Sequence, residues 1–143
     1  MTEIRNEFNV ISKDKGGKAF ETVSRFELEN NEYKIFVDVN IDLFNIKVGD
    51  KIILELTKSL NENGEETNLE NGYTQDFGAG TKMDDYDYVM CGKIFKFVED
   101  EKEKKLAVIA SFGGLLLMVY GSPARLNIYS MGDNVFLLMK KRQ

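Results

Sequence analysis

Short apolar segments that alternate with polar residues, separated by glycines and charged turns, run along most of this chain. Residues 33–41, "YKIFVDVNI", show the alternation most clearly, and a period of two places every second side chain on one face of a β-strand. The apolar face carries Ile35, Val37, Val39 and Ile41, and the opposite face carries Lys34, Asp38 and Asn40. No stretch has the sustained apolar stripe of an amphipathic helix. We therefore predict an all-β fold.

The expected strands number eight, and glycines or short charged turns separate most of them. They cover residues 8–13, 19–29, 33–41, 49–56, 86–97, 105–112, 115–120 and 134–141. So many short strands at close spacing are typical of a barrel or a sandwich. We favour an eight-stranded antiparallel barrel, because closure removes the exposed strand edges that promote aggregation. At 143 residues the chain has the length of one domain, so we expect a single β-barrel domain over residues 1–143.

Two other features stand out along the chain. Residues 47–56, "KVGDKIILEL", and 130–139, "SMGDNVFLLM", share a Gly-Asp pair followed by apolar alternation. Internal duplication and independent use of the same turn chemistry both account for this similarity. The stretch from about 59 to 83 is rich in glycine, asparagine and acidic residues and has little periodicity, so we expect a long mobile loop there.

The side chains needed for common catalytic and metal chemistry are scarce. The chain has no histidine, which excludes a His-based triad and a His-ligated zinc site, and its one cysteine makes no thiolate cluster. Cys91 lies in an apolar strand, where we expect an inert buried thiol. The stretch with Asp84, Asp85 and Asp87 lacks the length and the turn glycine of a calcium loop, so we expect solvated carboxylates there. We therefore predict no catalytic residue, no metal site, no cofactor and no small-molecule substrate.

Charge and composition also restrict the partners. A net charge of −5 disfavours direct binding to a phosphate backbone. The aromatic residues would suit a base-stacking platform, but most occupy alternating core positions and few have basic neighbours. The basic tail "MKKRQ" fits a solvated terminus, and "KDKGGK" fits a hairpin turn. The lone thiol and the lack of an apolar N-terminal signal indicate a reducing compartment, and no apolar run is long enough to span a bilayer.

The stretch "SFGGLLLMVYG" over residues 111–121 predicts a β-hairpin with a defined register. Gly113 and Gly114 suit the two central turn positions, which both need positive φ. Counting outward gives three cross-strand pairs on a face suited to the core: Phe112 with Leu115, Ala110 with Leu117, and Val108 with Val119. The pairs on the opposite face are Ser111 with Leu116, Ile109 with Met118, and Ala107 with Tyr120. This second face is largely apolar too.

The second face of the hairpin can be covered in two ways: by other segments of this chain, or by a partner protein. Fully burying Ile109, Leu116, Met118 and part of Tyr120 gives on the order of 6–10 kcal/mol. Association itself costs roughly 4–15 kcal/mol in lost freedom, so this patch alone would hold a partner weakly. A stable complex needs more contact, such as backbone pairing along a strand edge or the flanking surface of residues 88–95.

Five motifs, in order along the chain, resemble one protein family: "SKDKGGKAFETVSR", "DVNIDLFNIKVGDKIILEL", "DYVMCGKIFKF", "SFGGLLLMVYG" and "VFLLMKK". Together they resemble the small subunit shared by the three eukaryotic nuclear RNA polymerases I, II and III, the eighth in the polymerase II size order. The similarity extends from about Ser12 to Lys141 and is weakest over residues 59–83. It implies an eight-stranded antiparallel barrel of the oligonucleotide/oligosaccharide-binding (OB) type, made of two related halves.

The resemblance also implies a non-catalytic subunit that docks on the largest polymerase chain. The family pattern S-Y-G-G-L-L-M falls on residues 111–117, and Y-V-M-Y-G-K falls on residues 88–93. Phe112 and Cys91 stand where the family has tyrosine, and Met118 stands where it commonly has arginine, which favours an apolar contact there. The expected partner-binding residues are Tyr88, Met90, Gly92, Lys93, Ile109, Gly113, Gly114, Leu115, Leu116, Met118 and Tyr120.

The leading hypothesis is thus a structural and assembly subunit of DNA-directed RNA polymerases I, II and III, located in the nucleus. Its expected partners are the largest subunit and the rest of the polymerase complex, with no direct nucleic-acid contact. The alternative is a free-standing module on the same scaffold that binds single-stranded nucleic acid, which the acidic net charge opposes. A small enzyme is a third candidate, with only carboxylates, tyrosines and lysines available and no identifiable substrate.

Overall fold

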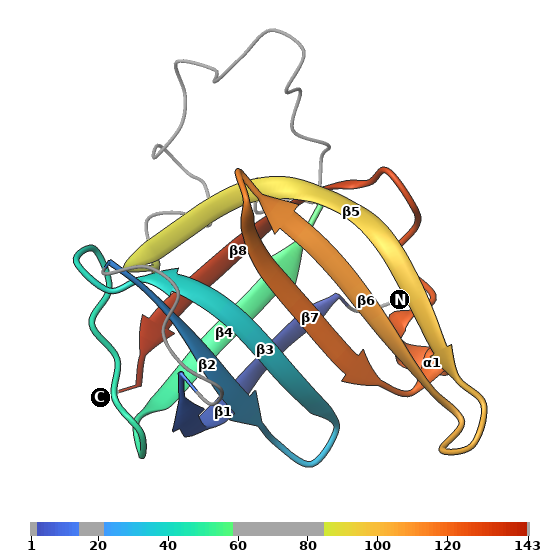
Figure 1. The fold of residues 1–143 in the computed structure, drawn as a ribbon, viewed down its shortest axis with the longest axis horizontal. Coiled ribbons are helices and arrows are strands. Elements are labelled where there is room, and N and C mark those ends of the chain that lie inside the picture. The colour runs from blue at the N-terminus through green and yellow to red at the C-terminus, as the bar shows by residue number, and fades with distance from the viewer. Residues whose placement is uncertain (1–2, 15–21, 59–84, 143) are drawn as a thin grey trace, which may run out of the picture.

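The computed structural model describes residues 3–14, 22–58 and 85–142. In this part of the chain eight antiparallel strands close into a barrel, in the order β1-β2-β3-β7-β6-β5-β8-β4 (Figure 1). Their bounds are β1 Ile4–Lys13, β2 Val23–Glu29, β3 Tyr33–Asn40, β4 Lys51–Thr57, β5 Tyr88–Asp100, β6 Lys105–Phe112, β7 Leu115–Gly121 and β8 Asn134–Lys141. The predicted eight-stranded antiparallel barrel is therefore confirmed.

Several element bounds differ from the prediction by a few residues: β2 begins at Val23 rather than at residue 19, and β5 covers Tyr88–Asp100 rather than residues 86–97. β1 begins at Ile4 rather than near Phe8, because its first residues pair with β4. A short helix, α1 (Pro123–Leu126), follows β7, with a proline in its first turn and Leu126 buried. The turn predicted at residues 13–18 lies mostly outside the described residues, and the loop predicted at 59–83 lies entirely outside them. The described helical segment is too short and too polar to cross a membrane.

The barrel interior is filled by the apolar face of each strand. Ile35, Val37 and Val39 of β3 are fully buried, and so are Ile52 and Leu54 of β4. These are the faces that the period of two predicts for residues 33–41 and 49–56. Alternation located the core correctly here because one face of each strand has to exclude water.

The two Gly-Asp segments form the same turn. Gly49 and Gly132 have φ of +97° and +83°, a backbone conformation that favours glycine. In each turn the Asp carboxylate accepts the backbone N–H of the residue three positions earlier: Asp50 from Lys47 at 2.9 Å, and Asp133 from Ser130 at 2.7 Å. The shared sequence therefore corresponds to shared turn geometry.

Each Gly-Asp turn also packs on a β-bulge of the strand beside it. The first turn exchanges two backbone hydrogen bonds with Val10 of β1, and the second makes the same two bonds with Ile94 of β5. Each turn also forms an ion pair with a lysine at the end of a strand: Asp50 lies 3.7 Å from Nζ of Lys141 at the end of β8, and Asp133 lies 3.3 Å from Nζ of Lys58 just after β4. The similarity thus extends beyond the turn, as in two halves of the same topology, β1–β4 and β5–β8.

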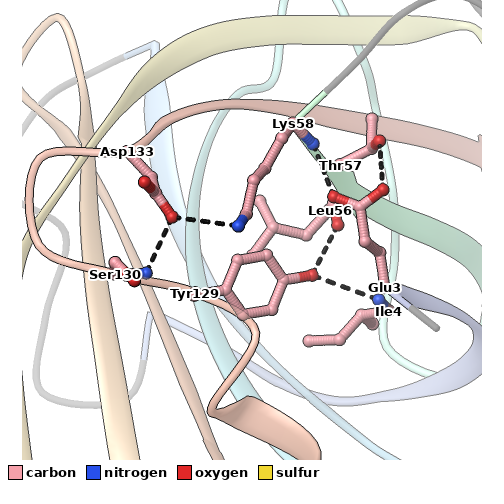
Figure 2. A network of polar contacts seen from close by, with 8 residues as sticks. All are labelled: Glu3, Ile4, Leu56, Thr57, Lys58, Tyr129, Ser130 and Asp133. Atoms are coloured by element: carbon pink, nitrogen blue, oxygen red, sulfur yellow. Dashed lines mark hydrogen bonds and ion pairs between the residues drawn. The ribbon is translucent and has the colours of Figure 1, made fainter. Parts of the chain in front are cut away.

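Tyr129 ties the connection between β7 and β8 to the first and fourth strands (Figure 2). Its hydroxyl donates to the carbonyl of Leu56 at 2.6 Å and accepts the backbone N–H of Ile4 at 3.1 Å. Beside it, the hydroxyl of Thr57 donates to the carboxylate of Glu3 at 2.8 Å. The Tyr129 side chain is buried, and this burial raises its pKa above the ordinary value. The network fixes the start of β1 against the end of β4.

Candidate docking surface

Strands β6 and β7 form the hairpin that the sequence predicts. Gly113 and Gly114 occupy its turn with φ of +64° and +99°. The strands pair in step from Phe112 with Leu115 down to Leu106 with Gly121. The predicted register is confirmed, because a two-residue turn with positive φ at both positions matches the twist of the two strands.

The two faces of the hairpin have different surroundings. Five side chains of the inner face are at most 5% exposed: Val108, Ala110, Phe112, Leu117 and Val119. Leu115, beside the turn on the same face, is half-buried. On the outer face Leu116 is 37% exposed, and Ile109 and Met118 are half-buried. Part of this apolar outer face is therefore in contact with solvent, where a partner protein has access to it.

A hollow of about 330 Å³ lies on the outer face of the hairpin. Phe36 of β3 is the cross-strand neighbour of Met118, and Ile109 of β6 is its neighbour on the other side. The full lining is Arg25, Phe36, Ile109, Leu116, Leu117 and Met118. Three adjacent strands thus contribute a row of large apolar side chains, with one arginine beside it.

An ion pair borders this hollow. Arg25 Nε and Nη2 donate to the two carboxylate oxygens of Asp38 at 2.7 and 3.1 Å, and the backbone N–H of Leu116 donates to the same carboxylate at 3.0 Å. The hydrogen bond with Asp38 raises the pKa of Arg25 above its ordinary value. Asp38 is nearly buried, so this carboxylate rigidly connects β2, β3 and β7.

A β-bulge continues the apolar row onto β5. Ile94 pairs with Ala110 and Lys96 pairs with Ile109, so Phe95 is the extra residue. Ile94 points into the core, whereas Phe95 is 46% exposed. The row therefore crosses four neighbouring strands: β3, β7, β6 and β5.

The remaining predicted residues of the hairpin lie around this face. Gly113 and Gly114 are exposed at its tip, and the half-buried Leu115 packs against the core. Tyr120 is half-buried on the outer face, and its hydroxyl donates to Asp100 at 2.8 Å. This hydrogen bond raises the pKa of Tyr120 above its ordinary value.

The predicted residues of β5 do not share one surface. Tyr88 is buried inside the barrel, where its ring stacks on Phe44 at a centroid distance of 5.4 Å and its hydroxyl accepts the backbone N–H of Asn40. Burial raises the pKa of Tyr88 above its ordinary value. Met90 also packs against the core. We therefore assign Tyr88 and Met90 to the barrel interior, away from the hairpin's outer face.

Gly92 and Lys93 have different roles in β5. A Cβ at Gly92 would lie 2.8 Å from Phe112 Cδ1 and closer still to the carbonyl oxygen of Ser111, so this position has room for glycine alone. Lys93 is exposed and pairs with Ser111, an outer-face residue of β6. Of the four β5 residues predicted, Lys93 is the one with a side chain on the hairpin's outer surface.

The list of expected partner-binding residues left out four residues of this surface: Arg25, Phe36, Asp38 and Phe95. The alternation of residues 33–41 already places Phe36 on the outer face, so that signal could have found it. The link between Asp38 and Arg25 depends on the β2–β3 register, and the exposure of Phe95 depends on the bulge. Both are set by pairing between strands rather than by local pattern.

The outer face of β8 shows the opposite arrangement. Phe136 and Leu138 point outward there but are at most 1% exposed, and Tyr86, Val89 and Cys91 pack against them. The hydroxyl of Tyr86 donates to the carboxylate of Glu55 at 3.0 Å. This second apolar face is therefore covered, and Cys91 belongs to the covering cluster.

Acidic residues in the described ranges do not gather into a metal site. No group of three or more His, Cys, Asp or Glu in residues 3–14, 22–58 and 85–142 is placed to hold an ion. Asp85 and Asp87 are exposed, and Asp84 lies outside these ranges.

Comparison with known proteins gives a consistent family match. The family model described as RNA polymerase Rpb8 matches residues 5–141 of this chain. The "DNA-directed RNA polymerases II, IV and V subunit 8B" of Arabidopsis thaliana is 36% identical, with 94% of this chain and 92% of that protein covered. The "DNA-directed RNA polymerases I, II, and III subunit rpabc3" of Dictyostelium discoideum is 35% identical, with 99% of each covered. The related protein of Saccharomyces cerevisiae, subunit RPABC3, is 32% identical, with 94% of each covered.

Proposed function

Because this chain belongs to the RNA polymerase Rpb8 family, we propose that it is a non-catalytic subunit common to the nuclear RNA polymerases I, II and III. The names of its relatives in Dictyostelium and yeast support this assignment, since both are subunits of these three enzymes. The chain contributes to transcription through the assembled complex, and it works in the nucleus. It performs no chemistry of its own.

The proposed partner is the largest subunit of the polymerase, and the proposed contact is the outer face of the β6–β7 hairpin. The observation that carries this is the apolar row of Phe36, Met118, Ile109 and Leu116, which meets solvent around a hollow large enough for a partner side chain. Adjacent apolar side chains that remain in contact with solvent often mark the binding site of another polypeptide. Direct contact with nucleic acid is not part of this proposal.

The free energy available from this face sets the size of the interface. Ile109, Leu116 and Met118 are already partly buried, so covering the rest yields about 2–4 kcal/mol. That gain is smaller than the roughly 4–15 kcal/mol cost of association. The interface therefore extends to neighbouring exposed apolar residues, of which Phe95 at 46% and Val98 at 43% exposure adjoin the hairpin on β5.

Substitutions on the outer face test this docking site. Leu116→Asp and Met118→Asp place a charge in the apolar row, and we expect each to abolish co-purification with the largest subunit from the source cell. Val48→Asp is the matched control, because Val48 is 58% exposed and precedes β4, on the opposite side of the barrel from β7. Circular dichroism and thermal unfolding of the isolated variants check that they fold. Wild-type co-purification of both folded variants would remove the docking site from the proposal.

A further inference from the structure

The bulge of β5 presents an exposed aromatic ring at a fixed position. Ile94 is anchored in the core, and its backbone N–H and carbonyl bond to Asp133 and Gly132 at 3.0 and 2.8 Å. These bonds hold the turn of residues 130–133 against the bulge. Met131 in that turn is 62% exposed, and Phe95 is 46% exposed. Two large apolar side chains thus meet solvent on a rigid part of the barrel.

Two exposed lysines of β5 flank Phe95. Lys93 and Lys96 are both exposed, and neither has a carboxylate within ion-pair distance in the described part of the chain. Two other cations of this outer face, on β2 and β3, differ in this respect. Arg25 is paired with Asp38 at 2.7 Å, and Lys34 is paired with Glu27 at 2.9 Å.

The carboxylate of the neighbouring turn, Asp133, already has partners. Asp133 Oδ2 accepts the backbone N–H of Ser130 at 2.7 Å and lies 3.3 Å from Lys58 Nζ. The bulge therefore combines exposed apolar side chains with two lysines that lack an ion-pair partner among residues 3–14, 22–58 and 85–142, on a chain whose net charge is −5. A surface of this kind is complementary to apolar side chains flanked by carboxylates.

We propose that the docking surface continues over the β5 bulge and there binds an acidic segment of the partner polypeptide. This inference rests on the proposed function, because the bulge adjoins the hairpin face through the pairing of Lys96 with Ile109. An apolar side chain of the segment packs on Phe95 and Met131. Its carboxylates pair with Lys93 and Lys96, and they set the orientation of the segment on the barrel.

A nucleic acid fits these observations less well than an acidic polypeptide. Two lysines provide two phosphate contacts, whereas specific and non-specific binders commonly neutralise several phosphates. The apolar row from Phe95 through Ile109 to Met118 has no counterpart in a phosphate backbone. Bases could still stack on Phe95, so the experiment includes nucleic acid as an outcome.

Charge reversal on the full-length chain tests the inference. The double variant Lys93→Glu, Lys96→Glu should lower retention by the polymerase on the order of tenfold at low salt, because two attractions become repulsions. Rising salt should weaken wild-type binding and should not weaken binding of this variant. The double variant Lys102→Glu, Lys104→Glu makes the same charge change in the exposed turn between β5 and β6, and it should bind like wild type. Lys93→Arg, Lys96→Arg should retain binding.

The possible results separate this inference from the docking proposal. Leu116→Asp could abolish binding while the Lys93, Lys96 glutamate variant binds like wild type at every salt concentration. In that case the proposal of an acidic partner segment is wrong, and the proposed docking site on the hairpin is retained. If Leu116→Asp and Met118→Asp also bind like wild type, the docking site itself is wrong. A labelled single-stranded 20-nucleotide oligomer tests for nucleic-acid binding. If it binds wild type but not the Lys93, Lys96 glutamate variant, and this variant still binds the polymerase like wild type, the two lysines bind nucleic acid and the inference is wrong.

Discussion

The carboxylate of Asp38 on β3 accepts the backbone N–H of Leu116 on β7 at 3.0 Å. This bond lies one step beyond the last backbone pair between these strands, Val37 with Leu117. The side chain thus takes over where the β3–β7 pairing ends. Since Leu116 is also the most exposed apolar residue of the hairpin's outer face, Asp38 holds the proposed docking residue in place from a neighbouring strand.

Asp38→Ala should lower the free energy of unfolding by about 1–3 kcal/mol, because the change leaves the N–H of Leu116 without its acceptor and Arg25 without its partner. Urea unfolding followed by circular dichroism measures the difference. Asp42→Ala removes the same charge from an exposed turn position and should change stability by less than about 0.5 kcal/mol. Equal effects of the two substitutions would contradict the role given to the Asp38 carboxylate.

The strands and the hairpin register could be predicted because both follow from local rules. Alternation indicates which side chains are buried, and the turn at Gly113-Gly114 fixes the pairing register of β6 with β7. The same rules predicted an apolar outer face for this hairpin. They could not decide between cover by the chain and cover by a partner, because that depends on how distant segments pack.

The parts that escaped prediction depend on contacts between distant segments. The bulge at Phe95 is stabilised by the turn of residues 130–133, more than thirty positions along the chain. The first half of β1 has polar residues between Ile4 and Phe8 and is a strand because β4 pairs with it. Tyr88 belongs to a recognisable motif, yet the register of β5 points its side chain into the core. Motif membership alone therefore did not identify surface residues.

Removal of the Tyr129 hydroxyl should destabilise the barrel. Tyr129→Phe keeps the buried ring but leaves the N–H of Ile4 and the carbonyl of Leu56 without this partner, at a cost of about 1–3 kcal/mol. Thermal or urea unfolding measures it. Tyr120→Phe is the matched control, because its hydroxyl bonds to the carboxylate of Asp100 at the surface, and we expect a change below about 0.5 kcal/mol. A larger effect at Tyr120 than at Tyr129 would be inconsistent with the network of Figure 2.

Two glycines should respond differently to substitution. Gly92→Ala forces a Cβ against Ser111 and the ring of Phe112, and it should lower the free energy of unfolding by about 1–3 kcal/mol or prevent folding. Gly113→Asn places a side chain in open space at φ of +64°, which asparagine tolerates, so its cost should stay below about 1 kcal/mol. Denaturant midpoints of both variants provide the comparison. A mild effect of Gly92→Ala would mean that β5 and β6 are less closely apposed than the structure shows.

Tyr86 should make stability decrease at alkaline pH. Burial, together with the adjacent carboxylate of Glu55, raises the pKa of Tyr86 from its ordinary value of 10.0 to about 12. The folded state therefore keeps the phenol proton that the unfolded chain loses first, so this contribution to stability is complete below pH 10 and is lost as the pH rises to about 12. Because the side chain is only half-buried, we expect the loss to be about 1 kcal/mol rather than the full value of a two-unit shift.

Comparison of wild type with Tyr86→Phe isolates this effect, because the substitution keeps the ring beside Phe136 and removes the titrating group. At pH 8 wild type should be more stable by about 1 kcal/mol, the value of the lost hydrogen bond to Glu55. At pH 11.5 the difference should be close to zero, since the other titrating groups are common to both proteins and cancel. Urea unfolding at the two pH values gives both numbers, and a difference that does not shrink with pH would show that Tyr86 titrates alike in the folded and unfolded chains.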